Sequence, residues 1–142
     1  MQTKGKSYLK IIGGLMAIFG AIGAVIYVVS FIDGGLLLLG SALEGQKAAA
    51  VGSVEIMVVF GFGLAWSILE LITGITGVIN WEKPEKAGLC FKLGIVIAIF
   101  AVVANLGQIW FAGFSVTALV SLLVGLILPA GFCYGAKLNQ SK

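Results

Sequence analysis

Glu70 is the residue of this chain best placed to do chemistry, because it is an acid in the middle of a long apolar segment. A charged carboxyl near the centre of a bilayer costs roughly 2.5 kcal/mol or more, so such a group should be buried, paired or protonated. No lysine lies within the apolar segments to pair with it. The position indicates either a proton or cation site or a polar contact between helices, with pairing to a partner protein's lysine as a third interpretation.

Four polar side chains are candidates to share a site with Glu70. Ser67 and Thr73 flank it at helical spacing, and Asn105 and Gln108 belong to a later apolar segment. Counting about 1.5 Å per residue from the cytoplasmic end of each segment places Glu70 at about 14 Å and Asn105 at about 19 Å. This similar depth predicts a contact between the two residues. Such a contact would serve either to hold two helices together or to bind an ion.

The basic and sulfur-containing residues argue against most enzyme chemistry. All nine basic residues are lysine, and the chain has neither arginine nor histidine. Arginine is the usual bidentate ligand of phosphate and carboxylate, and histidine the usual proton shuttle and metal ligand. The two cysteines, Cys90 and Cys133, are far apart and form no metal-binding spacing. We therefore expect no enzyme activity, no metal and no cofactor.

Membrane-spanning helices must position these residues. The chain has 142 residues, of which 60% are hydrophobic and 11% charged, and its mean hydropathy is +1.12. A soluble domain carries about 25% charged residues, so lipid is expected to be the solvent for most of this chain. Four apolar segments are long enough to cross a bilayer core of roughly 30 Å, namely residues 11–32, 56–79, 93–112 and 114–136. We predict an all-α membrane protein, a four-helix transmembrane bundle forming a single domain over residues 1–142.

The distribution of lysines predicts the orientation of the bundle, because cytoplasmic loops carry an excess of basic residues. Eight lysines flank one side of the four segments, and one, Lys47, flanks the other. The eight are Lys4, Lys6, Lys10, Lys83, Lys86, Lys92, Lys137 and Lys142. We predict cytoplasmic N- and C-termini in a multi-pass protein of the cell membrane, expected to be a bacterial cytoplasmic membrane. The asymmetry also explains the formal net charge of +3, so we expect no nucleic-acid partner.

Two longer connections are expected between the segments. The cytoplasmic loop, residues 80–92, is polar and contains Pro84 as a turn breaker. The outer loop, residues 33–54, is unusual because four leucines follow the glycine pair at 34–35, namely Leu36, Leu37, Leu38 and Leu39. Exposing these leucines to water is costly, so this stretch is expected to lie in the interface, to pack on the bundle or to continue the first helix after a break. The alternative is a docking surface for a partner.

Small and polar residues recur at helical spacing on every segment. The third segment shows the longest run, at residues 94, 98, 101, 105, 108 and 112. Spacings that alternate between four and three give a 3.5-residue period, which is typical of a helix-packing seam. We expect these stripes to face each other within the bundle while bulky apolar residues face lipid. The same stripes would equally suit a homo-oligomer, and the sequence does not separate these cases.

The opening of the first segment, LKIIGGLMAIFG at residues 9–20, resembles the start of many small bacterial four-span membrane proteins of unknown function. The resemblance is compositional, covers mainly this segment and implies no activity. Better-defined four-span families differ from this chain. Claudins have a tryptophan-rich outer loop with two cysteines, and small multidrug exporters have their essential glutamate in the first helix, whereas both features are missing here. Rotor-ring subunits share a mid-membrane acid on the second helix, but their polar-loop pattern and dense glycine stripe are absent.

Two functions are consistent with this pattern. The first is a non-enzymatic structural or accessory protein that packs against itself or a larger membrane complex, as the small-residue seams and short soluble loops indicate. The alternative is a small proton- or cation-coupled carrier or channel that uses Glu70. The expected partners are the lipid bilayer and either further copies of the chain or another membrane protein.

Overall fold

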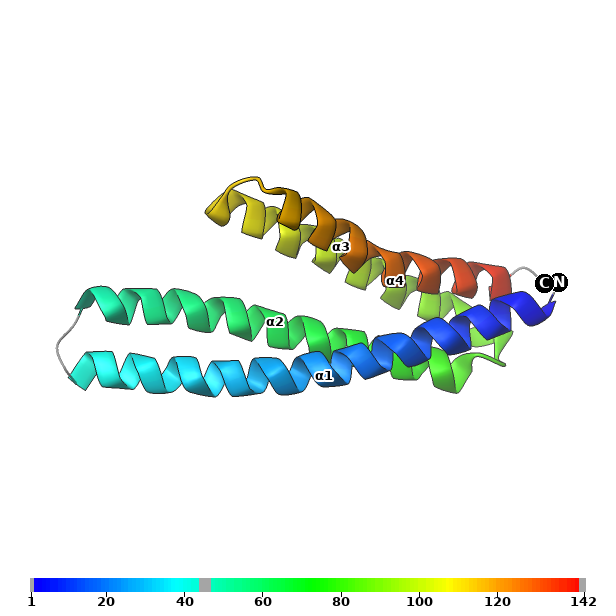
Figure 1. Ribbon diagram of the computed structural model, residues 1–142. Helices are drawn as coiled ribbons and strands as arrows, with labels where there is room; N and C mark the ends of the chain where they lie inside the picture. The colour runs from blue at the N-terminus through cyan, green and yellow to red at the C-terminus, as the bar shows by residue number, and fades with distance from the viewer. Residues whose placement is uncertain (1, 44–46, 141–142) are drawn as a thin grey trace.

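The computed structural model describes residues 2–43 and 47–140, which fold into two helical hairpins (Figure 1). The elements in chain order are α1 (Gln2–Leu43), α2 (Lys47–Asn80), the 3-10 helix η1 (Pro84–Lys86), α3 (Ala87–Ala112) and α4 (Val116–Gln140). α1 packs along α2 and α3 along α4, and the hairpins meet chiefly through α1 and α4. The prediction of an all-helical chain is confirmed for the described residues.

Three stretches of the described residues are long and apolar enough to cross a membrane, namely Lys4–Leu37, Gly61–Asn80 and Pro84–Leu106. They include the first predicted span and most of the second and third. The fourth predicted span, residues 114–136, falls mostly within α4, whose 25 residues give a length of about 37 Å. Its place in a membrane remains a prediction.

The hairpins are packed together at one end and diverge toward the other (Figure 1). Both termini and the connection at residues 81–86 lie at the packed end, and the turn between α3 and α4 lies at the open end. The buried hydrophobic core lies on α1, α3 and α4 and comprises Leu9, Met16, Ala87, Cys90, Ile97, Ala101, Phe132 and Ala136. Its members on α1 and α4 belong to the parts of those helices nearest the termini, so this end holds the fold together.

Glycine allows α1 and α2 to approach closely. A Cβ atom on Gly74 of α2 would lie 2.5 Å from the carbonyl oxygen of Gly13 and would also collide with the backbone of Ala17. On α1, a Cβ atom on Gly20 would lie 2.5 Å from the backbone nitrogen of Leu71. Small residues at such spacing permit backbone contact between membrane helices. The predicted stripes therefore face each other within one chain along this pair of helices.

The connection between α3 and α4 is tight and makes them an antiparallel hairpin. Gly113 caps α3 with a φ of 82°, a left-handed conformation that side chains with a Cβ rarely adopt. The backbone N–H of Leu119 donates to the carbonyl of Ser115 over 3.2 Å, which closes the first turn of α4. The reversal of the chain thus requires a glycine at residue 113.

Most of the predicted outer loop, residues 33–54, is helical, as in the alternative that continues the first helix, but the expected break is absent. Residues 33–43 continue α1, and residues 47–54 belong to α2, while residues 44–46 lie outside the described part of the chain. The glycine pair at 34–35 does not break the helix. Each glycine costs about 1 kcal/mol relative to alanine, but the following leucines favour a helix, and in an apolar environment a helix satisfies every backbone group internally.

The predicted cytoplasmic loop, residues 80–92, is shorter than expected. α2 ends at Asn80, α3 begins at Ala87, and η1 occupies three of the residues between them. Pro84 is the first residue of η1, where its fixed φ is favourable and its missing N–H is not needed. The apolar part of the third segment begins only after Lys92, but helical hydrogen bonding extends into the polar flank before it.

Candidate functional site

Glu70 lies on α2, half-buried and ten residues before the helix ends at Asn80, which corresponds to about 15 Å. Its carboxyl accepts a hydrogen bond from the side chain of Trp66, one helical turn earlier. The indole N–H is a donor only. This partner can hold the carboxyl in place, but it has no lone pair with which to take up a proton.

Trp66 connects this acid to the neighbouring hairpin. Its ring stacks on Phe100 of α3 with centroids 6.0 Å apart, and Phe62 of α2 stacks on the same ring at 4.7 Å with the planes 10° from parallel. These three rings form the aromatic junction between α2 and α3. Glu70 is therefore located beside the contact between the two hairpins, on the side toward the packed end.

The structure does not bring Glu70 and Asn105 together. The side-chain amide of Asn105 donates to the carbonyl of Ala101 in its own helix over 2.8 Å, and no hydrogen bond joins it to Glu70 among the described residues. Trp66 and Phe100 mark a common level of α2 and α3. Glu70 lies four residues from this level toward the packed end, and Asn105 lies five residues beyond it toward the open end, so about 13 Å separates them along the helix axes.

Ser67 and Thr73 are both buried, at 2% and 1% exposure. Ser67 points at α1, where its Oγ atom is 2.6 Å from the position that a Cβ on Gly23 would occupy. It is one residue away from Trp66, or about 100° around the helix, and so belongs to a different face of α2. Close packing between α1 and α2 explains the small size of Ser67 without a role in binding.

The remaining sequence-predicted residues lie elsewhere. Gln108 belongs to α3 beyond Asn105, and its side chain is outside the described part of the structure, as is that of Leu38. Leu36, Leu37 and Leu39 lie on α1 near its open-end tip with 64%, 63% and 59% of their surface exposed. Glu70 instead lies on the packed-end side of the aromatic junction, so these leucines do not share a site with it.

A polar network at the packed end was not predicted from the sequence. The side-chain amide of Asn139 on α4 is 5% exposed and donates to the backbone carbonyl of Trp81 over 3.1 Å. The ammonium of Lys10 on α1 lies 4.6 Å from the centre of the Trp81 ring. Trp81 follows α2 directly, so these contacts join three helices. A sequence signal was present, since tryptophan is typical of a membrane interface, but its partners are distant in the chain.

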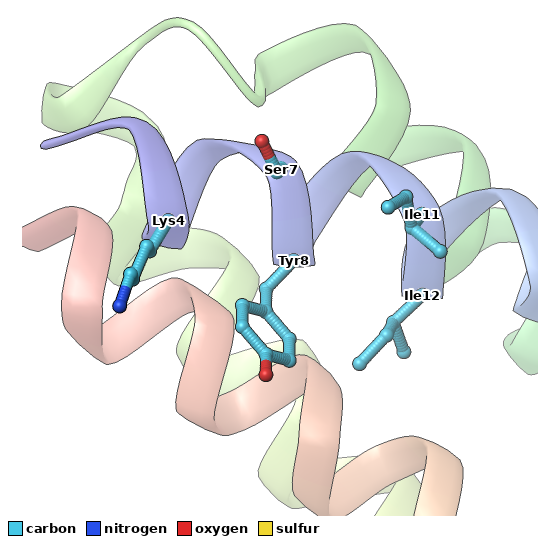
Figure 2. A pocket seen from close by; sticks show the side chains of 5 residues that line it. All are labelled: Lys4, Ser7, Tyr8, Ile11 and Ile12. Atoms are coloured by element: carbon cyan, nitrogen blue, oxygen red, sulfur yellow. The ribbon is translucent and has the colours of Figure 1, made fainter.

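A groove of about 540 Å³ runs along α1 near the N-terminus, and Figure 2 shows its lining side chains. They are Lys4, Ser7, Tyr8, Ile11 and Ile12. Lys4 and Tyr8 point from α1 toward the adjacent helix α4. The groove therefore has a cation and hydroxyl groups near the N-terminus and an apolar end one to two turns further along α1.

The described residues contain no group of three acidic, cysteine or histidine side chains able to hold a metal ion. Cys90 is buried and Cys133 is half-buried, both as free thiols, and Cys133 Sγ contacts the carbonyl oxygen of Phe91 at 3.8 Å. Comparison with protein-family models, curated proteins and solved structures finds no match for this chain.

Proposed function

We propose that the chain is an integral protein of the cell membrane with four transmembrane helices and cytoplasmic termini, and that the membrane is bacterial. Large apolar side chains are exposed on every helix, for example Ile26 of α1, Ile72 of α2, Ile99 of α3 and Ile127 of α4. Lipid is the medium that accommodates such a surface. The lysine-rich termini and the connection at residues 81–86 lie at one end of the fold, while α2 begins with Lys47 at the other. This arrangement supports the proposed orientation.

Cysteine labelling tests the topology. Glu82 lies in the connection between the hairpins, and Phe114 lies in the turn at the open end; both are exposed. In a chain carrying Cys90→Ala and Cys133→Ala, Phe114→Cys should react with a membrane-impermeant maleimide in intact cells. Glu82→Cys should react only after permeabilisation. Labelling of both positions from the same side would contradict the proposed four-span orientation.

In this membrane protein we assign α1 and α2 a structural or accessory role, in which their outer ends pack against another membrane protein or a second copy. The observation that carries this proposal is a difference in length. α1 has 42 residues and α2 has 34, or about 63 and 51 Å, whereas α3 and α4 have 26 and 25, or about 39 and 37 Å. A bilayer core is about 30 Å thick, so the α1–α2 hairpin extends well beyond what is needed to span it.

The projecting end of α1 is apolar where a solvated helix would be polar. Besides Leu36, Leu37 and Leu39, Leu43 is 80% exposed. Burying a leucine side chain is worth about 1.5–3 kcal/mol. Contact with an apolar surface of a partner would therefore stabilise this end, which supports a role in assembly.

The small-residue stripes do not supply this interface, because several of their glycines are already in contact within the chain. Besides the α1–α2 contacts, a Cβ atom on Gly94 of α3 would lie 2.5 Å from Cys133 Sγ of α4. A Cβ atom on Gly135 of α4 would lie 3.1 Å from the backbone nitrogen of Leu9. An assembly contact made by the projecting leucines leaves these internal contacts undisturbed.

Site-specific photo-crosslinking tests the assembly role. Leu37 and Ile99 are similarly exposed, at 63% and 59%, but Leu37 lies on the projecting hairpin and Ile99 on α3 within the expected bilayer. Replacing Leu37 with p-benzoylphenylalanine should give a discrete higher-mass protein adduct in intact membranes. The same replacement at Ile99 should give lipid adducts. A chain that gives no protein adduct at Leu37 and runs as a monomer on blue-native gels would refute the proposal.

A proton- or cation-coupled carrier is the second candidate, and it is favoured by the position of Glu70. Its carboxyl lies half-buried, far from either end of α2, next to the aromatic junction between the hairpins. Relative movement of the hairpins at this junction would change the surroundings of the acid. Glu70→Gln retains an oxygen that accepts from Trp66 but removes the ionisable group. Loss of pH-driven flux in reconstituted Glu70→Gln protein, with unchanged thermal stability, would support the carrier; equal flux would eliminate it.

A further inference from the structure

The groove along the start of α1 has the composition of a lipid-binding site, with polar groups and an apolar surface in a fixed order. Lys4 and Tyr8 line the part nearer the N-terminus, and Ile11 and Ile12 line the part further along the helix. Lys4 and Ile12 are eight residues apart, or about 12 Å along the helix axis. A phospholipid in the cytoplasmic leaflet presents its phosphate and its acyl chains in the same order.

A contact between α1 and α4 orients the tyrosine of the groove. Tyr8 packs edge-on against Tyr134 of α4, with ring centroids 6.0 Å apart and planes at 90°. A Cβ atom on Gly135 would lie 3.1 Å from Tyr8 Cβ, and one on Gly131 would lie 2.7 Å from Ile12 Cδ1. These glycines let α4 approach α1 closely on one side of the groove. Tyrosine is enriched at membrane interfaces, where its hydroxyl contacts headgroups and its ring contacts chains.

The two helices beside the groove bring no acidic side chain to it. The chain has six acidic residues, the first at Asp33 and the last at Glu85. The part of α1 that lines the groove and the whole of α4 therefore carry no acid. Lys4 is exposed, as is Lys137 near the end of α4. No carboxylate from either helix opposes an anion in the groove.

We propose that the groove binds an anionic phospholipid of the cytoplasmic leaflet. Its phosphate contacts the ammonium of Lys4 and the hydroxyl of Tyr8, and an acyl chain lies along Ile11 and Ile12. Basic pockets beside membrane helices on the cytoplasmic side bind lipid headgroups in this way. The site goes beyond the proposed assembly role, and it rests only on the orientation of the chain in the membrane.

Spin-labelled lipids test this site in the full-length chain. The protein is reconstituted in phosphatidylcholine bilayers that contain traces of spin-labelled phosphatidylglycerol or spin-labelled phosphatidylcholine. Electron paramagnetic resonance then gives the fraction of each label immobilised by the protein. Phosphatidylglycerol should bind more tightly than phosphatidylcholine. Lys4→Gln should reduce this preference by up to about fivefold, the factor that corresponds to about 1 kcal/mol per lysine at an anionic surface.

Lys83→Gln is the matched control, because Lys83 is an exposed lysine in the connection between the hairpins and lies outside the groove. It should leave the preference unchanged, and both variants should unfold at the temperature of the unmodified chain. Equal loss in the two variants, or no preference in the unmodified chain, would overturn the proposal. Displacement of the label by millimolar inorganic phosphate would also overturn it, because it would indicate a simple anion site.

The cysteine-labelling experiment distinguishes this failure from a failure of the proposed topology. If Glu82→Cys is labelled from the cytoplasmic side and phosphatidylglycerol still shows no preference, the lipid site is wrong and the orientation stands. If Glu82→Cys is labelled from outside, the orientation is wrong, and the premise of the lipid site fails with it.

Discussion

The buried side-chain amide of Asn139 donates a hydrogen bond to the backbone carbonyl of Trp81 over 3.1 Å. Asn139 is on the last turn of α4, and Trp81 is the first residue after α2. The bond therefore joins the end of the chain to the connection between the two hairpins. The ring of Trp81 also receives the ammonium of Lys10 from α1. These contacts lie at the packed end, where the four helices converge (Figure 1).

Removing this amide should destabilise the packed end. Asn139→Ala leaves the Trp81 carbonyl without its donor, and losing a buried hydrogen-bond partner costs about 1–3 kcal/mol. Gln140→Ala is the control, because Gln140 is the adjacent, exposed amide. Thermal unfolding in mild detergent should show a lower midpoint for Asn139→Ala alone. Equal midpoints for the two variants would show that the bond contributes nothing to stability.

The close contact between α1 and α2 should not accept even one methyl group. In Gly74→Ala the new Cβ would lie 2.5 Å from the carbonyl oxygen of Gly13, so the helices must separate. Overpacking of this kind costs about 1–3 kcal/mol. Gly125→Ala on α4 is the matched change, since nothing beyond its own stretch of helix lies within 4 Å of its Cβ position. Denaturant titration should show a loss of stability only for Gly74→Ala, and a loss of equal size in both would contradict the assigned packing.

The aromatic junction should couple the two hairpins energetically. Phe62 of α2 and Phe100 of α3 stack with their centroids 4.7 Å apart, and such pairs contribute about 0.5–1.5 kcal/mol beyond their buried area. A double-mutant cycle with Phe62→Leu and Phe100→Leu measures this coupling. We expect a coupling free energy in that range. Strictly additive effects of the two substitutions would mean that the rings do not interact.

The stabilising contact of Lys10 with the Trp81 ring should depend on the positive charge and not on lysine in particular. Lys10→Gln removes a cation whose nitrogen lies 4.6 Å from the ring centre, and we expect a loss of about 0.5–1 kcal/mol in unfolding free energy. Lys10→Arg retains the charge and should retain most of the stability. Equal losses in the two variants, measured by thermal unfolding, would assign the effect to packing of the lysine stem instead.

The part of the candidate site that was predictable from the sequence is Glu70 itself, because a lone acid in an apolar segment is visible without coordinates. Its partner was not predictable by depth. The apolar segment that contains Asn105 begins after Lys92, whereas the helix begins at Ala87, and this shift of five residues is about 7.5 Å. The observed partner, Trp66, lies one helical turn before Glu70, and this spacing is visible in the sequence. Spacing alone, however, does not show whether an acid bonds to a neighbour on its own helix or to a residue on another helix.

The sequence by itself determined what depends on composition and local pattern. Its apolar segments specify helices, the single residue between its last two segments leaves room only for a tight turn, and its lysines flank one side of the four segments. Only the tertiary structure decided how far the helices run, which glycine meets which backbone, and that Asn139 reaches Trp81. The physical reason is the range of the interactions. Helix formation and hydropathy act within a few residues, whereas the bond between Asn139 and Trp81 alone joins positions 58 residues apart. All of these contacts depend on the register between whole helices.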